Sequence, residues 1–237
     1  LEGKFVIVTG GTFYKYLDAD FTLLQIVLRI LKANENAVLL MVGTGKAGEL
    51  YKRKAEEKGL KDRIYLMDNT PYLLSVFEHA HLYLCSYPMT GGLMAQIAVR
   101  QGLPVVAYSA KGMDYNDLSD ICYSEKFQTY TEAKAFCNEI HRLASNQTYY
   151  RQYADSFHYE EQSEIAKFRN TLKNIMSGTY VLPEITRYRN IQTIGRRMAK
   201  LYCDADNAYT HTYPSTIKYY NHLLEIEENK ARKKKMK

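Results

Sequence analysis

Three short glycine-containing turns are the segments of this 237-residue sequence best suited to chemistry. Each follows an apolar run: Thr9-Gly10-Gly11-Thr12, Gly43-Thr44-Gly45 and Thr90-Gly91-Gly92. Glycine lets a backbone approach a ligand closely, and a helix that begins at such a turn directs free N–H groups and a positive dipole end toward the ligand. One such turn is more often only a tight connection, but three together favour a ligand that carries phosphate.

The apolar runs before these turns alternate with helical patterns, which is typical of βαβ units. Six runs are short and continuously apolar, as in strands that are buried on both faces; they are residues 5–8, 37–42, 63–67, 82–86, 104–108 and 120–123. We therefore predict an α/β fold, with a doubly wound, mostly parallel six-stranded Rossmann-like sheet. Ligands bind beyond the carboxyl ends of the strands in such a sheet, where all three turns would lie.

The predicted helices have recognisable ends. Asp20 is expected to cap a helix whose apolar stripe runs from Phe21 to Leu31, and Thr129 and Glu132 have the spacing of a capping box. Gly59 is expected to end the helix at residues 45–58, and Gly178 to end one at residues 149–176. Residues 71–80 and 92–100 supply two shorter helices.

Two familiar phosphate motifs do not fit. Residues 4–11, KFVIVTGG, are similar to the opening of a short-chain dehydrogenase, but the next glycine comes only at Gly43, and Tyr108 and Lys111 are one residue too close for its catalytic pair. Residues 43–46 are similar to part of a P-loop. However, Leu40 stands where its first glycine belongs, and Ala47 where a hydroxyl should bind magnesium.

Residues 87–106, YPMTGGLMAQIAVRQGLPVV, resemble the donor-binding half of GT-B glycosyltransferases. The Gly91-Gly92 pair matches the opening of the family's motif, and Gly102-Leu103-Pro104-Val105-Val106 matches its end. The resemblance extends over residues 4–176 and is greatest to bacterial enzymes of polysaccharide biosynthesis. It implies one Rossmann-like half of a GT-B fold, which would bind the nucleotide-diphosphate sugar in transfer of a hexose to a surface-glycan or polysaccharide acceptor.

The resemblance also implies a donor site. The diphosphate would be held by Gly10, Gly11, Thr12 and Lys15 on one side and by Thr90, Gly91, Gly92 and Leu93 on the other. The donor cleft would be lined by Gly43, Thr44, Gly45 and Lys46, and the base or ribose would meet Asp68, Asn69 and Gln96. The favoured substrate is a UDP-sugar. No cofactor and no metal are expected, because positioning and electrostatics suffice to stabilise a departing diphosphate.

Two positions depart from the family's pattern. Ile97 stands where relatives place a ribose-binding acid, with the neutral Gln96 beside it, and Gly11 stands where many place a phosphate-binding arginine. These departures keep an alternative open, a catalytically silent, glycosyltransferase-like subunit that binds a companion enzyme or an acceptor. The sequence also begins Leu-Glu-Gly, without Met. We expect the N-terminal acceptor domain to be missing and the chain to be inactive alone.

The charge distribution divides the chain. Residues 179–237 hold 12 Lys and Arg against 6 Asp and Glu, which accounts for the whole net charge of +6. We predict a donor-binding domain at residues 1–178 and a basic helical extension at 179–237. The neutral body argues against nucleic-acid binding. Either the extension packs on the protein, which we favour, or it contacts an anionic membrane.

Other features exclude whole classes of protein. The longest apolar run, residues 37–42, is far too short to cross a bilayer, and the first residues lack the apolar region of a signal peptide. Four cysteines without paired spacing favour reduced thiols. We therefore expect a cytoplasmic protein, with association at the inner membrane face as the alternative.

Overall fold

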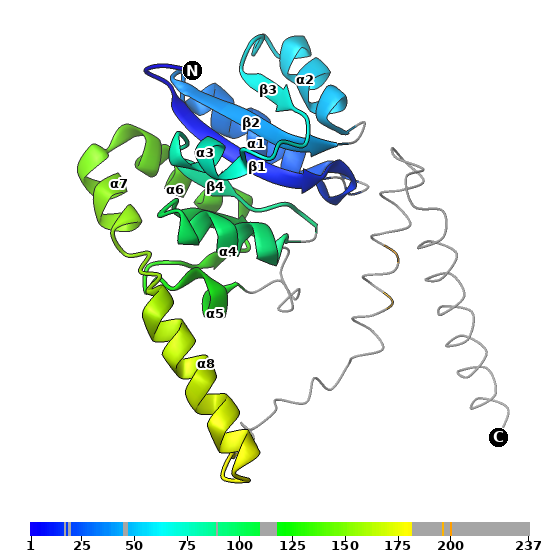
Figure 1. Ribbon diagram of the computed structural model, residues 1–237. Coiled ribbons are helices and arrows are strands. Elements are labelled where there is room, and N and C mark those ends of the chain that lie inside the picture. The colour runs from blue at the N-terminus through cyan, green and yellow to red at the C-terminus, as the bar shows by residue number, and fades with distance from the viewer. Residues whose placement is uncertain are drawn as a thin grey trace, which may run out of the picture.

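The computed structural model describes residues 1–16, 18, 20–44, 47–88, 90–109, 118–181, 196 and 200. Its core is a six-stranded parallel sheet with the order β3-β2-β1-β4-β5-β6 (Figure 1). The strands are β1 (Phe5–Thr12), β2 (Ala37–Thr44), β3 (Ile64–Met67), β4 (Leu82–Leu84), β5 (Val105–Tyr108) and β6 (Thr129–Tyr130). This is the predicted doubly wound order, in which the chain reverses direction across the sheet between β1 and β4.

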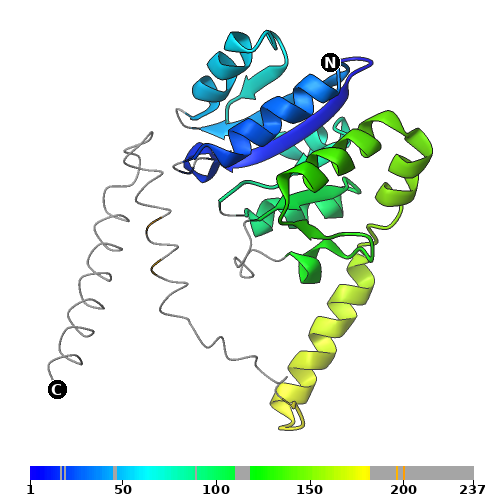
Figure 2. The same cartoon turned by 180° about the vertical axis from the view of Figure 1, so that it is seen from behind.

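Helices cover both faces of the sheet. On one face α1 (Thr22–Ala33) contacts α6 (Ala133–Ser145), and on the other α3 (Leu73–Glu78) contacts α4 (Gly92–Arg100). Figure 1 shows α3 and α4 in front of the strands. Figure 2, the view from the other side, shows α1 and α6 in front of them. The remaining helices are η1 (Phe13–Tyr16), α2 (Ala47–Glu57), α5 (Ser119–Cys122), α7 (Gln147–Ala154) and α8 (Glu161–Met176).

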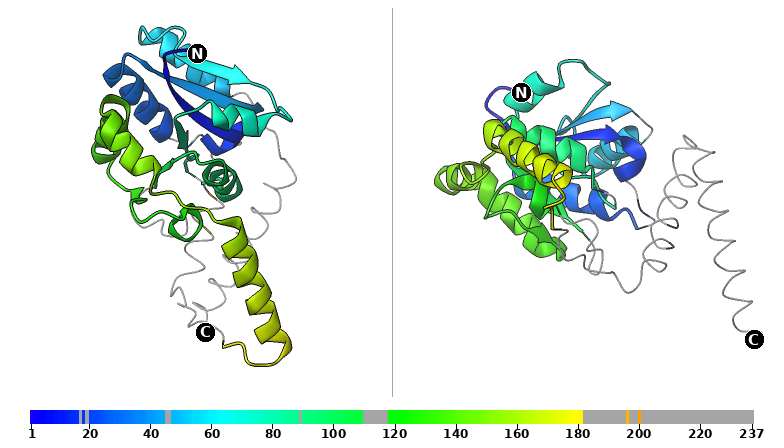
Figure 3. Two further views of the ribbon diagram at one scale, coloured as in Figure 1. Left: turned by 60° about the vertical axis from the view of Figure 1, so that its left-hand side comes forward. Right: turned by 60° about the horizontal axis from the view of Figure 1, so that its bottom comes forward.

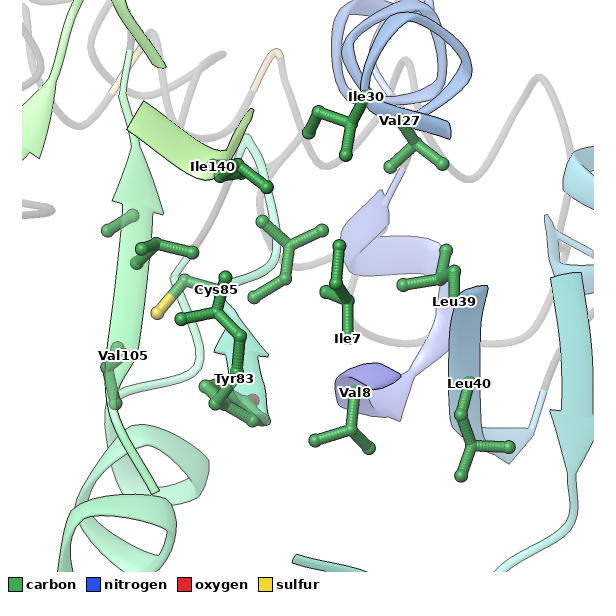
Figure 4. Close-up of a cluster of buried hydrophobic side chains, with 14 of the residues drawn as sticks. Ile7, Val8, Val27, Ile30, Leu39, Leu40, Tyr83, Cys85, Val105 and Ile140 are labelled. Carbon is green, nitrogen blue, oxygen red and sulfur yellow. The ribbon is translucent and has the colours of Figure 1, made fainter. Parts of the chain in front are cut away.

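The apolar runs of the central strands form because both faces of the sheet are buried there, whereas Tyr65 and Met67 of the edge strand β3 are exposed. Ile7 and Leu39 point toward α1, whereas the next residues along, Val8 and Leu40, point to the opposite face (Figure 4). All four side chains are buried. Successive side chains of a strand alternate between faces, so strands covered on both sides favour apolar residues at successive positions.

The predicted strand at residues 120–123 is wrong. Its place is taken by α5, which ends at Tyr123 in a left-handed conformation with φ of 49°. The sixth strand comes later, where Thr129 and Tyr130 pair with Ala107 and Tyr108 of β5. Residues 120–123 contain three apolar residues after Asp120, and so short a run has no periodicity that separates a helix from a strand.

Three predicted helix features are also wrong. Thr129 lies in β6 and therefore caps no helix, and the side chain of Glu132, at the N-cap of α6, makes no capping bond. The predicted helix at 149–176 is two helices, α7 and α8, separated by a segment in which Phe157 makes a β-bridge with Ser124. Asp20 does not cap α1 either. The N-cap residue is Phe21, and the carboxylate of Asp18 accepts bonds from the Thr22 amide at 2.6 Å and from its hydroxyl at 2.5 Å.

One arginine joins three elements at the edge of the sheet where the strands begin. Arg63, just before β3, donates from its Nε to the carbonyl oxygen of Ala37 at 2.7 Å. Its guanidinium also donates to the carbonyl oxygens of Leu31 and Asn34 at the end of α1, at 3.2 and 2.5 Å. A cation at a helix C-terminus satisfies carbonyls that have no partner within the helix.

The last described segment is α8, which leads away from the sheet (Figure 3). It ends at Met176, and Gly178 follows with φ of 70°, as expected of a residue just past a helix. Apart from residues 179–181, Arg196 and Lys200, the predicted basic extension lies outside the described residues, so it stays a prediction. Across the described part of the chain, no helix has the length and apolar content needed to span a membrane.

Candidate functional site

The first two glycine turns lie side by side at the carboxyl edge of the sheet. Gly11 at the end of β1 pairs in register with Gly43 at the end of β2. Their φ angles are 135° and 146°, a conformation that residues with a side chain rarely adopt. The two strands therefore leave the sheet at the same level, and both need glycine to do so.

The third glycine turn joins the same edge through α4. Gly91 is the N-cap of α4, and Gly92 is its first residue. A Cβ atom added to Gly10 would lie 2.7 Å from Cε of Met94 in α4, so the end of β1 touches the first turn of this helix. The backbone amides of Gly92, Leu93 and Met94 have no acceptor within an α-helix that starts here, and Leu93 is 71% exposed. The three turns thus meet at one edge.

Buried hydroxyl groups hold β1 and β4 together beneath this edge. The Thr9 hydroxyl donates to the carbonyl oxygen of Leu84 at 2.6 Å and lies 3.0 Å from the Tyr16 hydroxyl. The hydroxyl of Tyr83 donates to the carbonyl oxygen of Gly10 at 3.4 Å. Burial raises the pKa of Tyr16 and of Tyr83 well above the usual tyrosine value, so both hydroxyls stay protonated near neutral pH. They are suited to positioning the edge rather than to acid–base chemistry.

Four other predicted site residues lie in the described part of the structure near this edge. Lys15 is half-buried in η1, just after β1. Asp68 and Asn69 are exposed beyond the end of β3, and Gln96 is half-buried in α4. Because β3 lies at the outer edge of the sheet beyond β2, the predicted base contacts come from both sides of β1. Their role stays a prediction.

Part of the predicted site cannot be placed. Gly45 and Lys46 lie outside the described residues, as do the side chains of Thr12 and Thr44. Thr90 is half-buried just before α4. Within the described ranges, no three His, Cys, Asp or Glu side chains converge as metal ligands would.

Two residues near this edge were not predicted. Asp18 is buried and accepts bonds from Thr22 at the start of α1, and Met94 contacts Gly10. Met94 sits in a run of small and apolar residues that predicts only a packed helix, so nothing in the sequence singled it out. Asp18 and Asp20 are equally good caps by residue type. The left-handed conformation of Phe21, with φ of 53°, accompanies the bonds to the earlier aspartate.

A doubly wound parallel sheet whose reversal point is lined by glycine turns and a helix N-terminus defines a Rossmann-like domain of the kind that binds nucleotides. Residues 4–146 match the family model for group 1 glycosyl transferases, and the chain belongs to this family. The fold is that of the C-terminal half of GT-B glycosyltransferases, as the resemblance implied. No curated protein matches the sequence significantly.

Solved structures share the fold at low sequence identity. WaaG, a glycosyltransferase involved in lipopolysaccharide biosynthesis, superposes with a TM-score of 0.52 at 17% identity, over 66% of this chain and 42% of WaaG. The C-terminal domain of LpcC from Francisella tularensis gives 0.52 at 15% identity, over 65% of this chain and 83% of that domain. Anabaena HepE, in complex with UDP and glucose, gives 0.53 at 15% identity, over 72% of this chain and 48% of HepE. This chain therefore spans less than half the length of WaaG and HepE.

Proposed function

We propose that this domain binds the nucleotide-diphosphate sugar of a hexosyltransferase, with a UDP-sugar as the favoured donor. The observation that carries the proposal is the meeting of three glycine turns at the reversal point of the sheet. The acceptor in this proposal is a surface glycan or polysaccharide, in the cytoplasm or at the inner membrane face.

The chemistry of the proposed site follows from the backbone. The first amides of α4, with the positive end of its dipole, would face the diphosphate, and Gly11 would allow the end of β1 to approach it closely. Lys15 would add a positive charge. Hydrogen bonds that strengthen as the leaving diphosphate gains charge lower the barrier, and each such donor typically contributes about 2.7 to 4 kcal/mol. This chemistry requires no metal in the proposed mechanism.

Different solved structures support the proposed donor and the proposed class of acceptor. HepE was solved with UDP and glucose, which favours a UDP-sugar, and WaaG acts in lipopolysaccharide biosynthesis, which favours a surface glycan. We propose that the acceptor site belongs to a second half that this chain does not contain. The chain alone would then bind the donor but transfer little sugar.

A second candidate is a catalytically silent partner subunit. Ile97 is half-buried in α4, where relatives place an acid, and Gly11 supplies no charge to the end of β1. A subunit of this kind would keep the fold without binding a nucleotide tightly.

A nucleotide panel separates the two candidates. We expect UDP or a UDP-sugar to raise the melting temperature of the chain, and UMP to raise it less because it lacks the second phosphate. RT ln(1 + [L]/Kd) predicts about 2.7 kcal/mol of stabilisation at a ligand concentration of 100 times Kd. The absence of a shift with UDP, GDP, ADP and their sugars would instead favour the silent subunit.

A further inference from the structure

One side chain, that of Met94, connects two of the three glycine turns. Its terminal methyl group occupies the space beside Gly10, 2.7 Å from the position that a Cβ atom at Gly10 would take. The Cβ atom of Met94 lies 3.9 Å from the position that a Cβ atom at Gly91 would take. Met94 is half-buried and packs against the core. It therefore fills the gap between the end of β1 and the start of α4.

The other contacts of Gly10 leave little freedom on its remaining sides. Its carbonyl oxygen accepts a bond from Tyr83, and the neighbouring Thr9 is tied to Leu84 of β4. Gly10 is also paired with Val42 of β2, whose carbonyl oxygen lies 3.5 Å from the position of an added Cβ atom. The strand end is thus fixed to β2 and β4, and Met94 is a contact between this strand end and α4.

We propose that Met94 is a positioning residue for the diphosphate, which holds the end of β1 and the first turn of α4 at the separation that the two phosphates require. This inference rests on the proposed function, because it concerns the same donor site. A long unbranched side chain suits the role, since a methionine adapts its shape to an irregular gap. The missing side chain of Gly10 provides that gap.

A double-mutant cycle tests the contact without any ligand. Met94→Ala leaves the space beside Gly10 empty and should lower the melting temperature by roughly 4 to 8 °C. In that background Gly10→Ala should recover part of the loss, because the new methyl group enters the vacated space. In the wild-type background the same change must displace the Met94 methyl group. If the melting-temperature shifts of the two single variants simply add in the double variant, Met94 and Gly10 are not in contact and the proposal is wrong.

Nucleotide affinity tests the positioning role. Met94→Ala should raise the Kd for UDP on the order of tenfold and change the Kd for UMP by less than about twofold, because UMP has no second phosphate to position. Met94→Leu keeps most of the side-chain volume and should retain the UDP affinity of the wild type. Equal losses for UDP and UMP would show that Met94 supports only the fold.

The two proposals fail in different ways. If wild-type protein binds UDP and the Met94→Ala variant discriminates UDP from UMP as wild type does, only the role of Met94 is wrong. If wild-type protein binds neither UDP, GDP nor ADP, the proposed donor site is wrong and its positioning residue is wrong with it. The melting cycle then still reports whether Met94 and Gly10 are in contact.

Discussion

Gly11 and Gly91 both line the proposed phosphate site, but only Gly11 needs to be glycine for its backbone conformation. Its φ is 135°, whereas Gly91 has an ordinary φ of −87°. Gly11→Ala should therefore lower the free energy of unfolding by about 1 to 3 kcal/mol. In the matched control Gly91→Ala, the new methyl group would meet nothing closer than 3.7 Å, and only the poorer N-cap propensity of alanine should cost stability, less than about 1 kcal/mol. Urea unfolding measures both, and an equal cost would contradict this assignment.

His81 makes the stability of the domain depend on pH. Its Nδ1 accepts a hydrogen bond from the Val6 amide at 3.1 Å, which only the neutral ring can do at that atom. Burial lowers the pKa of His81 below its usual 6.5. The unfolded chain therefore binds a proton more readily, so the stabilisation is present above about pH 6.5 and is lost as the pH falls through the folded-state pKa.

The measurement is the melting temperature of wild type and His81→Asn between pH 8 and pH 5. The asparagine oxygen can accept the same bond but does not titrate, so the variant should lose less stability on acidification than wild type. A hydrogen bond of this kind contributes about 0.5 to 1.5 kcal/mol. Identical pH profiles would exclude His81 as the source.

At the scale of secondary-structure elements, Arg63 fixes the end of α1 against β2 and β3. Arg63→Ala should lower the free energy of unfolding by about 2 to 3 kcal/mol, because charge-assisted bonds to three carbonyl groups are lost. Arg63→Lys should retain only part of the lost unfolding free energy, because an ammonium group lacks the planar set of donors of a guanidinium. Arg53→Ala, an exposed position on α2, is the control and should change stability by less than about 0.5 kcal/mol.

The elements also show which parts of the fold can be predicted from the sequence. The first five strands were predicted because their residues are mainly apolar, and α4 was predicted at its observed bounds because glycine begins it and Gly102 follows it. The short β6 was missed because two residues, Thr129 and Tyr130, carry no pattern. Its pairing with β5 depends on contacts distant in sequence.

The site was predictable only in part, for a related reason. Each glycine turn is a local signal, and a parallel sheet necessarily brings strand ends to one edge, so the meeting of the turns follows from the sequence. The contact between Met94 and Gly10 joins a helix to a strand that is distant in sequence, and no spacing along the chain encodes it. Three-dimensional packing supplied that information.

At the scale of the whole molecule, the sheet domain and α8 differ in how much of their apolar surface is covered. Phe136 in α6 is fully buried, whereas Phe168 in α8 is 68% exposed. Phe136→Ala should cost about 3 to 5 kcal/mol of unfolding free energy, and Phe168→Ala less than about 0.5 kcal/mol. Chemical denaturation of the two variants compares them, and a large cost at Phe168 would mean that something covers α8 in solution.

The exposure of α8 has a consequence for limited digestion. None of its residues is buried, and a bond of 3.4 Å between the Tyr123 hydroxyl and Glu164 connects its first turn to the body. Local opening of such a helix requires little energy compared with opening of the sheet. Within the described chain, trypsin should therefore cut first beside Lys167, Arg169 and Lys173. The remaining fragment would still carry the entire sheet and all three glycine turns.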